Sequence, residues 1–503
     1  MTTLPSLACC ILLLYAAAGN AVAQVTSSLR AGTAKVDITN TNATPSGDSL
    51  YARALVLSDG TTTAVIVTVD AVAIAEIGTI KNNYLANVRA QLEKDIGLKP
   101  ANLLINASHC HGVVCEDVEQ RTVQVVKEAR SKLVPVKAGA GRGHENRISE
   151  NRRLRLKDGR QADVRHAYSM PPDEAVAGIG PVDPEIGVLR LDRLDGSTLA
   201  VLYNFACHPI QGIPSGGNTA DLTGFASKVI EDNLSEGTLA FFVQGCAGDI
   251  NPVLYKDVNL PHNAETLGNL LGLSTLKAVR KIATRESAPL RIRNETIALP
   301  RADHAPRIAA LEAEQTRLLK SLRGTSLNLK TFIPLFVKYK ISGEFPSAYS
   351  HAYLRDQAVE KDDWTHLDAV NGSNLEQYIR NIHVMEELTR VQANLALLQT
   401  HQTRNIAAGK STVDAEVLGL RVGDLVLVTF PGELTVQIGL NIKKLSPHAA
   451  TFVAGYTNGY LYYSPTEEQL ANTGCAQEDC ECLLGPGWQA LFENKVAALL
   501  KEL

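Results

Sequence analysis

Two histidines separated by one residue are the first feature of this sequence that could do chemistry. His109 and His111 stand in the segment Ser-His-Cys-His-Gly at 108–112, directly after the apolar run 102–107. If a strand continues through this segment, the two side chains point to the same face and can address one site. Neutral imidazole is a good zinc ligand. Such a pair also occurs where histidines only satisfy hydrogen bonds, so the metal hypothesis needs further residues.

Two further segments place a polar side chain where a predicted strand ends. His208 follows the apolar run 199–205 and precedes a proline. It is either another ligand or a hydrogen-bonded histidine at a strand-to-loop corner. Asp249 lies in the segment 244–252, whose small residues let the backbone approach a ligand closely. Asp249 is a candidate carboxylate behind the metal ligands, and a tight glycine turn is the alternative explanation.

The fourth segment combines a carboxylate with phenols. Glu433 follows the apolar run 425–430 and a Pro-Gly turn, where a carboxylate could equally be solvated. Four tyrosines, Tyr460 and Tyr463 among them, fall within residues 456–463 of a chain that is only 5% aromatic. A buried aromatic cluster is one explanation, and phenols that contact a metal or a substrate are the other.

The elements that must position these residues follow an α/β rhythm. Short β-rich runs at 64–69 and 102–107 alternate with helical patterns at 80–95 and 120–133. The run 64–69 is apolar almost throughout, as expected for a strand buried on both faces. We therefore predict an α/β fold of mixed β-sheets flanked by helices, with functional loops at strand ends.

Residues 304–403 break this rhythm and are predicted to form an inserted helical hairpin. Apolar residues recur at helical spacing over 306–322 and 375–399, among many Glu, Arg and Gln residues. The stretch 349–374 between them is polar and irregular. Strand patterns then resume, and the chain ends in a helix predicted at 488–503.

The composition excludes several classes of protein. With 45% hydrophobic and 20% charged residues, the chain is neither disordered nor a collagen-like repeat. Its 49 lysines and arginines are outnumbered by 53 aspartates and glutamates, and no long basic run occurs. No nucleic-acid partner is therefore expected.

The N-terminus is predicted to be a signal peptide, residues 1–23. Its apolar run Leu7–Ala18 has twelve residues, too few to cross a bilayer as a helix. The segment Ala-Val-Ala at 21–23 fits the small-x-small cleavage pattern. A buried N-terminal helix is the alternative. Residues 24–503 would then form one exported domain, secreted or periplasmic.

Export would leave seven cysteines in the mature chain, an odd number, so at least one of them cannot pair within it. Oxidising conditions favour disulfides between cysteines that are close in the sequence. The local options are Cys110 with Cys115, and Cys475 with either Cys480 or Cys482.

Taken in order, these segments resemble the neutral/alkaline, non-lysosomal ceramidase family. The resemblance covers about residues 30–300 and 412–490, and six motifs follow one another in the family's order. The motifs are the His-x-His at His109–His111, the strand end Phe205–Pro209, the segment Asp221–Ala226, the Gly-Asp turn Gly248–Pro252, the Pro-Gly-Glu segment Pro431–Thr435 and the tyrosine element Asn458–Tyr463.

The resemblance implies one zinc ion per chain. Two histidines, a glutamate and a tyrosine hold zinc in that family. Carried over by position, they are His109, His208, Glu433 and Tyr463. Tyr460 lies three residues away in the same element and is the alternative fourth ligand.

The resemblance also implies catalytic roles. His111, the second histidine of the first motif, would face the substrate and move a proton toward the leaving amine. Arg152 matches an Asn-Arg segment of the family and would contact the substrate. Tyr460 or Tyr463 would donate a hydrogen bond to the oxyanion. Asp249, from the glycine-rich segment described above, would support the ligands from behind.

Two departures separate this chain from the family. The serine to which characterised ceramidases give a catalytic role is missing from Gln244-Gly245-Cys246. The C-terminal immunoglobulin-like domain of the long ceramidases is also expected to be missing. Water activated by zinc removes the absolute need for the serine.

The resemblance and the predicted signal peptide together predict a secreted zinc-dependent hydrolase that cleaves an amide bond by metal-activated water, with residues 24–503 as its catalytic domain. Its substrate would be N-acyl-sphingosine or a related N-acyl lipid, and such a substrate suits contact with a membrane surface. Two alternatives stay open. One is a zinc hydrolase for a different N-acyl or ester substrate, and the other is a non-catalytic binding protein on the same scaffold.

Overall fold

The structure is a computed structural model, and it describes residues 29–43, 48–164, 170–212, 218–255, 257, 259 and 263–503. The predicted signal peptide, residues 1–23, and its cleavage site lie outside the described residues. Over the described part of the chain, no helix combines the length and the apolarity that a bilayer-spanning segment requires.

The larger of two main sheets has eight strands in the order β12-β11-β10-β5-β1-β2-β3-β4. The pairs β3–β4 and β11–β12 are parallel and the others antiparallel, so the sheet is mixed as predicted. The strands are β1 (Arg30–Asp37), β2 (Tyr51–Ser58), β3 (Thr63–Val69), β4 (Leu103–Ala107), β5 (Val134–His144), β10 (Glu185–Arg193), β11 (Thr198–Phe205) and β12 (Leu239–Gln244).

This sheet bends between β1 and β5, which pair only at Arg30–Pro135 and Ala31–Val134. Strand β12 at one end then contacts β3 and β4 at the other end. The Asn106 side chain joins the two ends, because its oxygen accepts a hydrogen bond from the Gln244 backbone N–H at 2.9 Å. The loops that follow β4, β11 and β12 therefore meet in one place.

The second main sheet packs face to face against the first. Leu189 and Leu191 of the large sheet share one apolar core with Leu418, Leu427 and Phe452 of the small sheet. Its strands, in the order β14-β15-β16-β18, are β14 (Leu290–Pro300), β15 (Thr412–Val422), β16 (Leu425–Thr429) and β18 (Ala450–Ala454).

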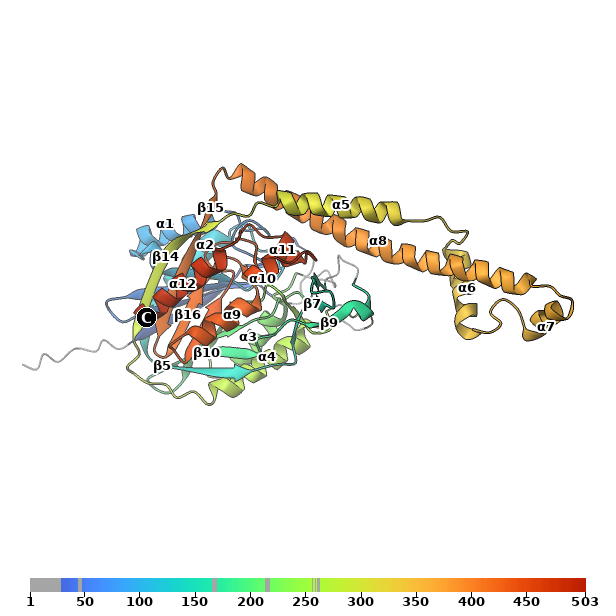
Figure 1. The fold of residues 1–503 in the computed structure, drawn as a ribbon. Coiled ribbons are helices and arrows are strands. Elements are labelled where there is room, and N and C mark those ends of the chain that lie inside the picture. The colour runs from blue at the N-terminus through green and yellow to red at the C-terminus, as the bar shows by residue number, and fades with distance from the viewer. Residues whose placement is uncertain are drawn as a thin grey trace, which may run out of the picture.

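Helices cover the outer faces of both sheets, which gives four layers (Figure 1). Strand β2 shows why such a strand is apolar at nearly every position: Ala54 and Val56 pack toward the helices, whereas Leu55 and Leu57 pack between the sheets. The helices on the large sheet are α1 (Tyr84–Ile96), α2 (Val118–Ser131), α3 (Asp221–Asp232) and α4 (Ala264–Val279), and those on the small sheet are α9 (Val436–Leu445) and α12 (Trp488–Glu502).

The inserted hairpin is present and more helical than predicted. Helices α5 (Ala305–Ser321) and α8 (Asp363–Ala407) form its two arms. The prediction of an irregular stretch at 349–374 was wrong, because α7 (Ser350–Ala358) and the start of α8 occupy it, and α6 (Leu329–Ile341) was not foreseen. At 1.5 Å per residue, the 45 residues of α8 extend about 68 Å. The hairpin projects well beyond the sheets (Figure 1).

Several short elements surround the loops at the strand ends. They are two small sheets of two strands each, one sheet of three strands and two single-turn helices. These are β6 (Ser149–Asn151) with β13 (Ile250–Pro252), β17 (Glu433–Leu434) with β19 (Tyr463–Ser464), the sheet of β7 (Arg153–Leu156), β8 (Gln161–Asp163) and β9 (Val176–Ile179), and the helices α10 (Glu467–Leu470) and α11 (Gln477–Cys480).

Gly187 tests the contact between the two main sheets. A Cβ atom at this position would lie 2.4 Å from the Phe452 ring. Because overpacking a filled core costs about 1–3 kcal/mol, Gly187→Ala is expected to lower the free energy of unfolding by that amount in urea titrations.

Gly372→Ala is the matched control. Nothing lies within 4 Å of a Cβ at Gly372, which is on α8, so the change should leave the stability equal or slightly higher. Equal stability of the Gly187 and Gly372 variants would contradict the face-to-face packing.

Candidate functional site

Three of the predicted ligands converge in the interior where the strand ends meet. His109, His208 and Glu433 are at most 3% exposed, and one possible ligand atom from each lies within 4.8 Å of the others. The His208 Nε2 lies 3.1 Å from Glu433 Oε2, and the His109 Nε2 lies 3.6 Å from Oε1. Each imidazole therefore faces a different oxygen of one carboxylate.

Hydrogen bonds to backbone carbonyls fix the orientation of both imidazole rings. The His109 Nδ1 lies 2.6 Å from the Val72 carbonyl, and the His208 Nδ1 lies 3.0 Å from the Ile250 carbonyl. A carbonyl oxygen can only accept, so each Nδ1 carries a proton, and in a neutral ring the Nε2 then keeps its lone pair. Histidines that bind metals are oriented by hydrogen bonds of this kind.

The charges of the cluster also match a metal site. Burial lowers the pKa of His109 to about 3, which keeps the ring neutral. Burial works to raise the pKa of Glu433, but hydrogen bonds to the carboxylate, including one from the Tyr460 hydroxyl, act against it and hold the pKa below its usual value. Within the described residues, no lysine or arginine forms an ion pair with Glu433.

A divalent cation fits this donor set. Two unprotonated imidazole nitrogens and an ionised carboxylate direct lone pairs into one small volume, and without a positive charge among them these groups repel. Buried charges are normally paired or bound to a metal. His109, His208 and Glu433 could therefore hold a metal ion.

Tyrosines complete the surroundings of the carboxylate. The Tyr460 hydroxyl donates a short hydrogen bond to Glu433 Oε1, and the Tyr456 hydroxyl donates to Oε2 at 3.1 Å. Tyr463 stacks on His208 with ring centroids 6.5 Å apart, and its hydroxyl is hydrogen-bonded to Arg152. Both tyrosines named from the sequence therefore lie at the cluster, Tyr460 on the carboxylate and Tyr463 on an imidazole.

His111 is the solvent-facing member of the cluster. It is exposed, and its ring centroid lies 5.4 Å from that of the buried His109. The argument that placed the pair on one strand was wrong, because β4 ends at Ala107 and His109 has a left-handed backbone with φ of 68°. The turn of the loop, rather than strand alternation, brings the two rings together.

Asp249 and Arg152 lie behind the cluster, bound by the protein itself. The Asp249 carboxylate accepts hydrogen bonds from the Val436 N–H at 2.8 Å and from the Asn151 amide at 3.1 Å. Arg152 is 5% exposed and donates to Glu478 at 2.7 Å and to the Gly248 carbonyl at 2.8 Å. In this arrangement both residues position the loops that carry the ligands.

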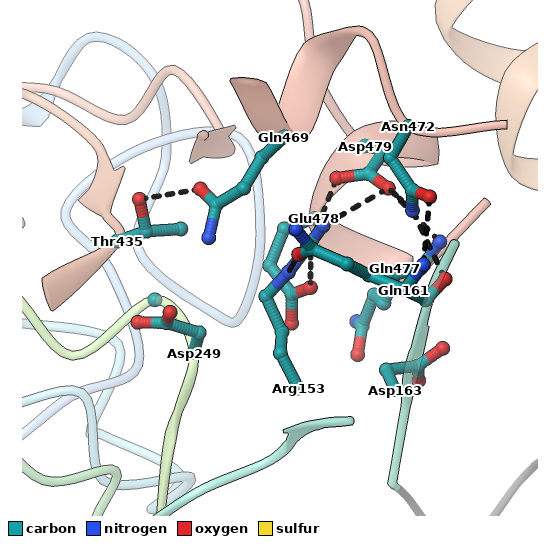
Figure 2. Close-up of polar contacts among 12 residues, drawn as sticks. Arg153, Gln161, Asp163, Asp249, Thr435, Gln469, Asn472, Gln477, Glu478 and Asp479 are labelled. Carbon is teal, nitrogen blue, oxygen red and sulfur yellow. Dashed lines mark hydrogen bonds and ion pairs between the residues drawn. The ribbon is translucent and has the colours of Figure 1, made fainter. Parts of the chain in front are cut away.

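A second buried arginine extends this support. Arg153 is 2% exposed and donates to Glu478 and Asp479, at 2.8 Å in each case. Figure 2 shows its guanidinium reaching the two carboxylates of α11, with Asn472 beside Asp479. This network joins β7 and the adjoining Arg152 to α11, and no pattern in the sequence identified it.

The cysteines are not part of the cluster. All seven in the described part of the chain are free, so none of the local disulfides considered from the sequence is present. Cys110 and Cys207 lie in the apolar core beneath the loops. Cys246 packs against Gly439, burial raises its pKa, and its sulfur is not among the possible ligand atoms that converge at the cluster.

Tyr456 is a site residue that sequence reasoning missed. It was visible only as one of several tyrosines in the segment 456–463. The structure gives it a left-handed backbone with φ of 53°, and Tyr462 has the same conformation with φ of 59°. Such conformations are uncommon for residues other than glycine and cluster at functional sites. They cannot be read from residue types.

Comparison with known proteins shows the fold. Neither protein-family models nor curated proteins give a match. Among solved structures, a ceramidase complexed with C2 aligns with a TM-score of 0.58 at 17% identity, over 95% of this chain and 76% of its own. The neutral ceramidase from Pseudomonas aeruginosa aligns with a TM-score of 0.56 at 18% identity, over 95% and 75%. The chain therefore has the fold of the neutral ceramidases.

Arg153→Met tests the support behind the cluster. The change leaves Glu478 and Asp479 buried without their shared partner, and breaking a buried ion pair costs about 3–5 kcal/mol. We expect a loss of that size in the free energy of unfolding, measured by urea titration.

Arg317→Met is the matched control, because Arg317 pairs with Glu314 on the hairpin surface, where its side chain is 62% exposed. An exposed pair contributes about 0–1 kcal/mol. Similar losses in the Arg153 and Arg317 variants would contradict the role given to the buried network.

Proposed function

We propose that this protein is a zinc-dependent hydrolase that cleaves the amide bond of a ceramide-like N-acyl lipid. The observation that carries the proposal is the convergence of His109, His208 and Glu433 on one buried volume. The fold shared with the neutral ceramidases supports the substrate class, although a fold alone does not define an activity.

Zinc is the metal that these donors favour. Two neutral imidazoles and a carboxylate are a common set of protein ligands in catalytic zinc sites. Tyr463, next to His208, is the proposed fourth ligand, and Tyr460 is the alternative. Bound zinc lowers the pKa of a water toward about 7 and polarises a carbonyl group.

The residues around the ligands transfer protons or hold the ligands in position. His111 is the exposed imidazole of the cluster, so it can take a proton from the attacking water and deliver it to the leaving amine. The Tyr456 and Tyr460 hydroxyls keep Glu433 in place and exclude water from its two oxygens. Asp249 and Arg152 hold the loops, which preserves the spacing of the ligands.

Water, rather than a side chain, is the proposed nucleophile. Where the ceramidases have a serine, this chain has Gly245, and a Cβ there would lie 2.9 Å from the Phe205 carbonyl oxygen and 3.0 Å from the Ala206 Cα. The backbone thus leaves no room for a side chain at this position. The Gly245 N–H instead donates to the Phe205 carbonyl at 2.8 Å.

Metal analysis tests the proposal directly. The purified chain is expected to carry about one zinc per molecule. His208→Ala and Glu433→Gln each remove a ligand, so both should lose most of the zinc and lower hydrolysis at least about 100-fold. The measurements are elemental analysis and hydrolysis of N-acyl-sphingosine, compared with other N-acyl amines and an ester.

His383→Ala is the control, because His383 is exposed on α8 and should leave zinc and activity unchanged. A wild-type protein without stoichiometric zinc, and unaffected by His208→Ala, would contradict the hydrolase and favour a binding protein. Preference for a different N-acyl compound or an ester would keep the zinc hydrolase but change its substrate.

Export to the periplasm or the medium is also proposed, on the pattern of residues 1–23. The mature protein is expected to begin at Gln24, which N-terminal sequencing of the exported protein checks. Ala23→Phe should prevent cleavage, because the enzyme that removes signal peptides needs a small residue there. A protein recovered inside the cell with residues 1–23 intact would contradict export.

A further inference from the structure

Helix α6, at the tip of the hairpin, exposes an apolar stripe. Leu329, Ile333, Val337 and Ile341 are 63%, 50%, 47% and 79% exposed. They follow one another at intervals of four residues, so they lie along one face of the helix. Large apolar side chains are normal on a surface when scattered singly, whereas a contiguous group marks an interaction site.

The opposite side of α6 is already anchored, so the stripe is not a misplaced core. Phe332 is buried and stacks on Tyr378 of α8 with ring centroids 4.4 Å apart. The Tyr339 hydroxyl donates to Asp368 of α8 at 2.8 Å. Asn328 caps the start of α6. The helix is therefore preformed and directs its apolar stripe away from these contacts.

The charge of α6 has one sign. Lys330, Lys338 and Lys340 are exposed, and no acidic residue occurs in Leu329–Ile341. Among the residues that the structure describes, none of the three forms an ion pair with a carboxylate. An apolar stripe bordered by lysines is typical of helices that lie in the surface of a membrane.

The position of α6 gives it access to a large flat surface. The hairpin carries it beyond the sheets, on the far end of α8 (Figure 1). A second exposed group of apolar side chains lies at the same end of the hairpin, on and next to α7: Tyr349, Leu354 and Val359.

We propose that α6 docks on the surface of a lipid bilayer that contains anionic lipids. The apolar stripe enters the boundary between headgroups and acyl chains, and the lysines meet the negative headgroups. A second copy of the chain fits less well, because pairing two such helices face to face brings lysines against lysines. The contact is confined to the bilayer surface and does not depend on the hydrolase activity.

Vesicle sedimentation of the full chain tests this proposal. The protein is expected to sediment with vesicles of phosphatidylcholine and phosphatidylglycerol, and more weakly with phosphatidylcholine alone. The double variant Ile333→Glu, Val337→Glu should bind at least about tenfold more weakly, because it places charges in the apolar stripe. Both side chains are exposed, so folding is expected to be unaffected, which circular dichroism checks.

Leu319→Glu is the matched control, since Leu319 is 55% exposed on the arm α5, away from the tip. It should bind like the wild type. Replacing Lys330, Lys338 and Lys340 by Gln should remove the preference for anionic vesicles. It should also make vesicle binding insensitive to salt.

Three results would overturn the proposal. The first is a wild type that stays in the supernatant with both vesicle compositions. The second is an equal loss in the Leu319 and Ile333/Val337 variants. The third is a dimer in light scattering that the Ile333/Val337 variant dissociates while vesicles have no effect, which would assign the stripe to a second copy of the chain. Binding is measured without substrate, so failure of the proposed hydrolase leaves the test intact.

Discussion

A buried carboxylate between two imidazoles is the interaction on which the rest of the site depends. Glu433 is 1% exposed and stays charged, although no lysine or arginine in the described part of the chain pairs with it. Burying an unpaired charge is costly. A cation bound beside the carboxylate would offset that cost, and the hydroxyls of Tyr456 and Tyr460 contribute further hydrogen bonds.

Close backbone contact brings these groups together. Helices and strands position the ligands only approximately, because His109, His208 and Glu433 all follow strand ends. Glycines determine the remaining spacing. A Cβ at Gly248 would lie 2.6 Å from the carbonyl oxygen of Glu433, and one at Gly455 would lie 2.9 Å from that of Gly432. The glycines therefore mark places where the main chains of three loops, those at Gly248, Gly432 and Gly455, are in contact around the site.

The sequence predicted the elements and the residues that converge at the candidate site better than it predicted their geometry. Apolar periodicity located the strands, both hairpin arms and the last helix, because burial on a sheet or helix face leaves a repeating pattern. Residue chemistry and the ceramidase resemblance selected His109, His208 and Glu433. The left-handed turn at His109 and the placement of Tyr456 could not be predicted from the sequence, because both depend on how loops distant in the chain pack together. Helix α6 was not predicted, because its apolar face is exposed and the prediction assumes that apolar residues point inward.

The hairpin is connected to the site through α11, which bears on how a docked tip would orient the molecule. Arg307 of α5 donates to the Asp479 carbonyl at 3.0 Å, and Asn394 of α8 donates to the Cys475 carbonyl. Helix α11 follows Cys475 and carries Glu478, which binds Arg152 beside Tyr463. Because hydrogen bonds from both arms hold the base of the hairpin against residues 475–479, the base cannot swing without breaking them. A surface that binds α6 would therefore also set the direction in which the body and its candidate metal site face.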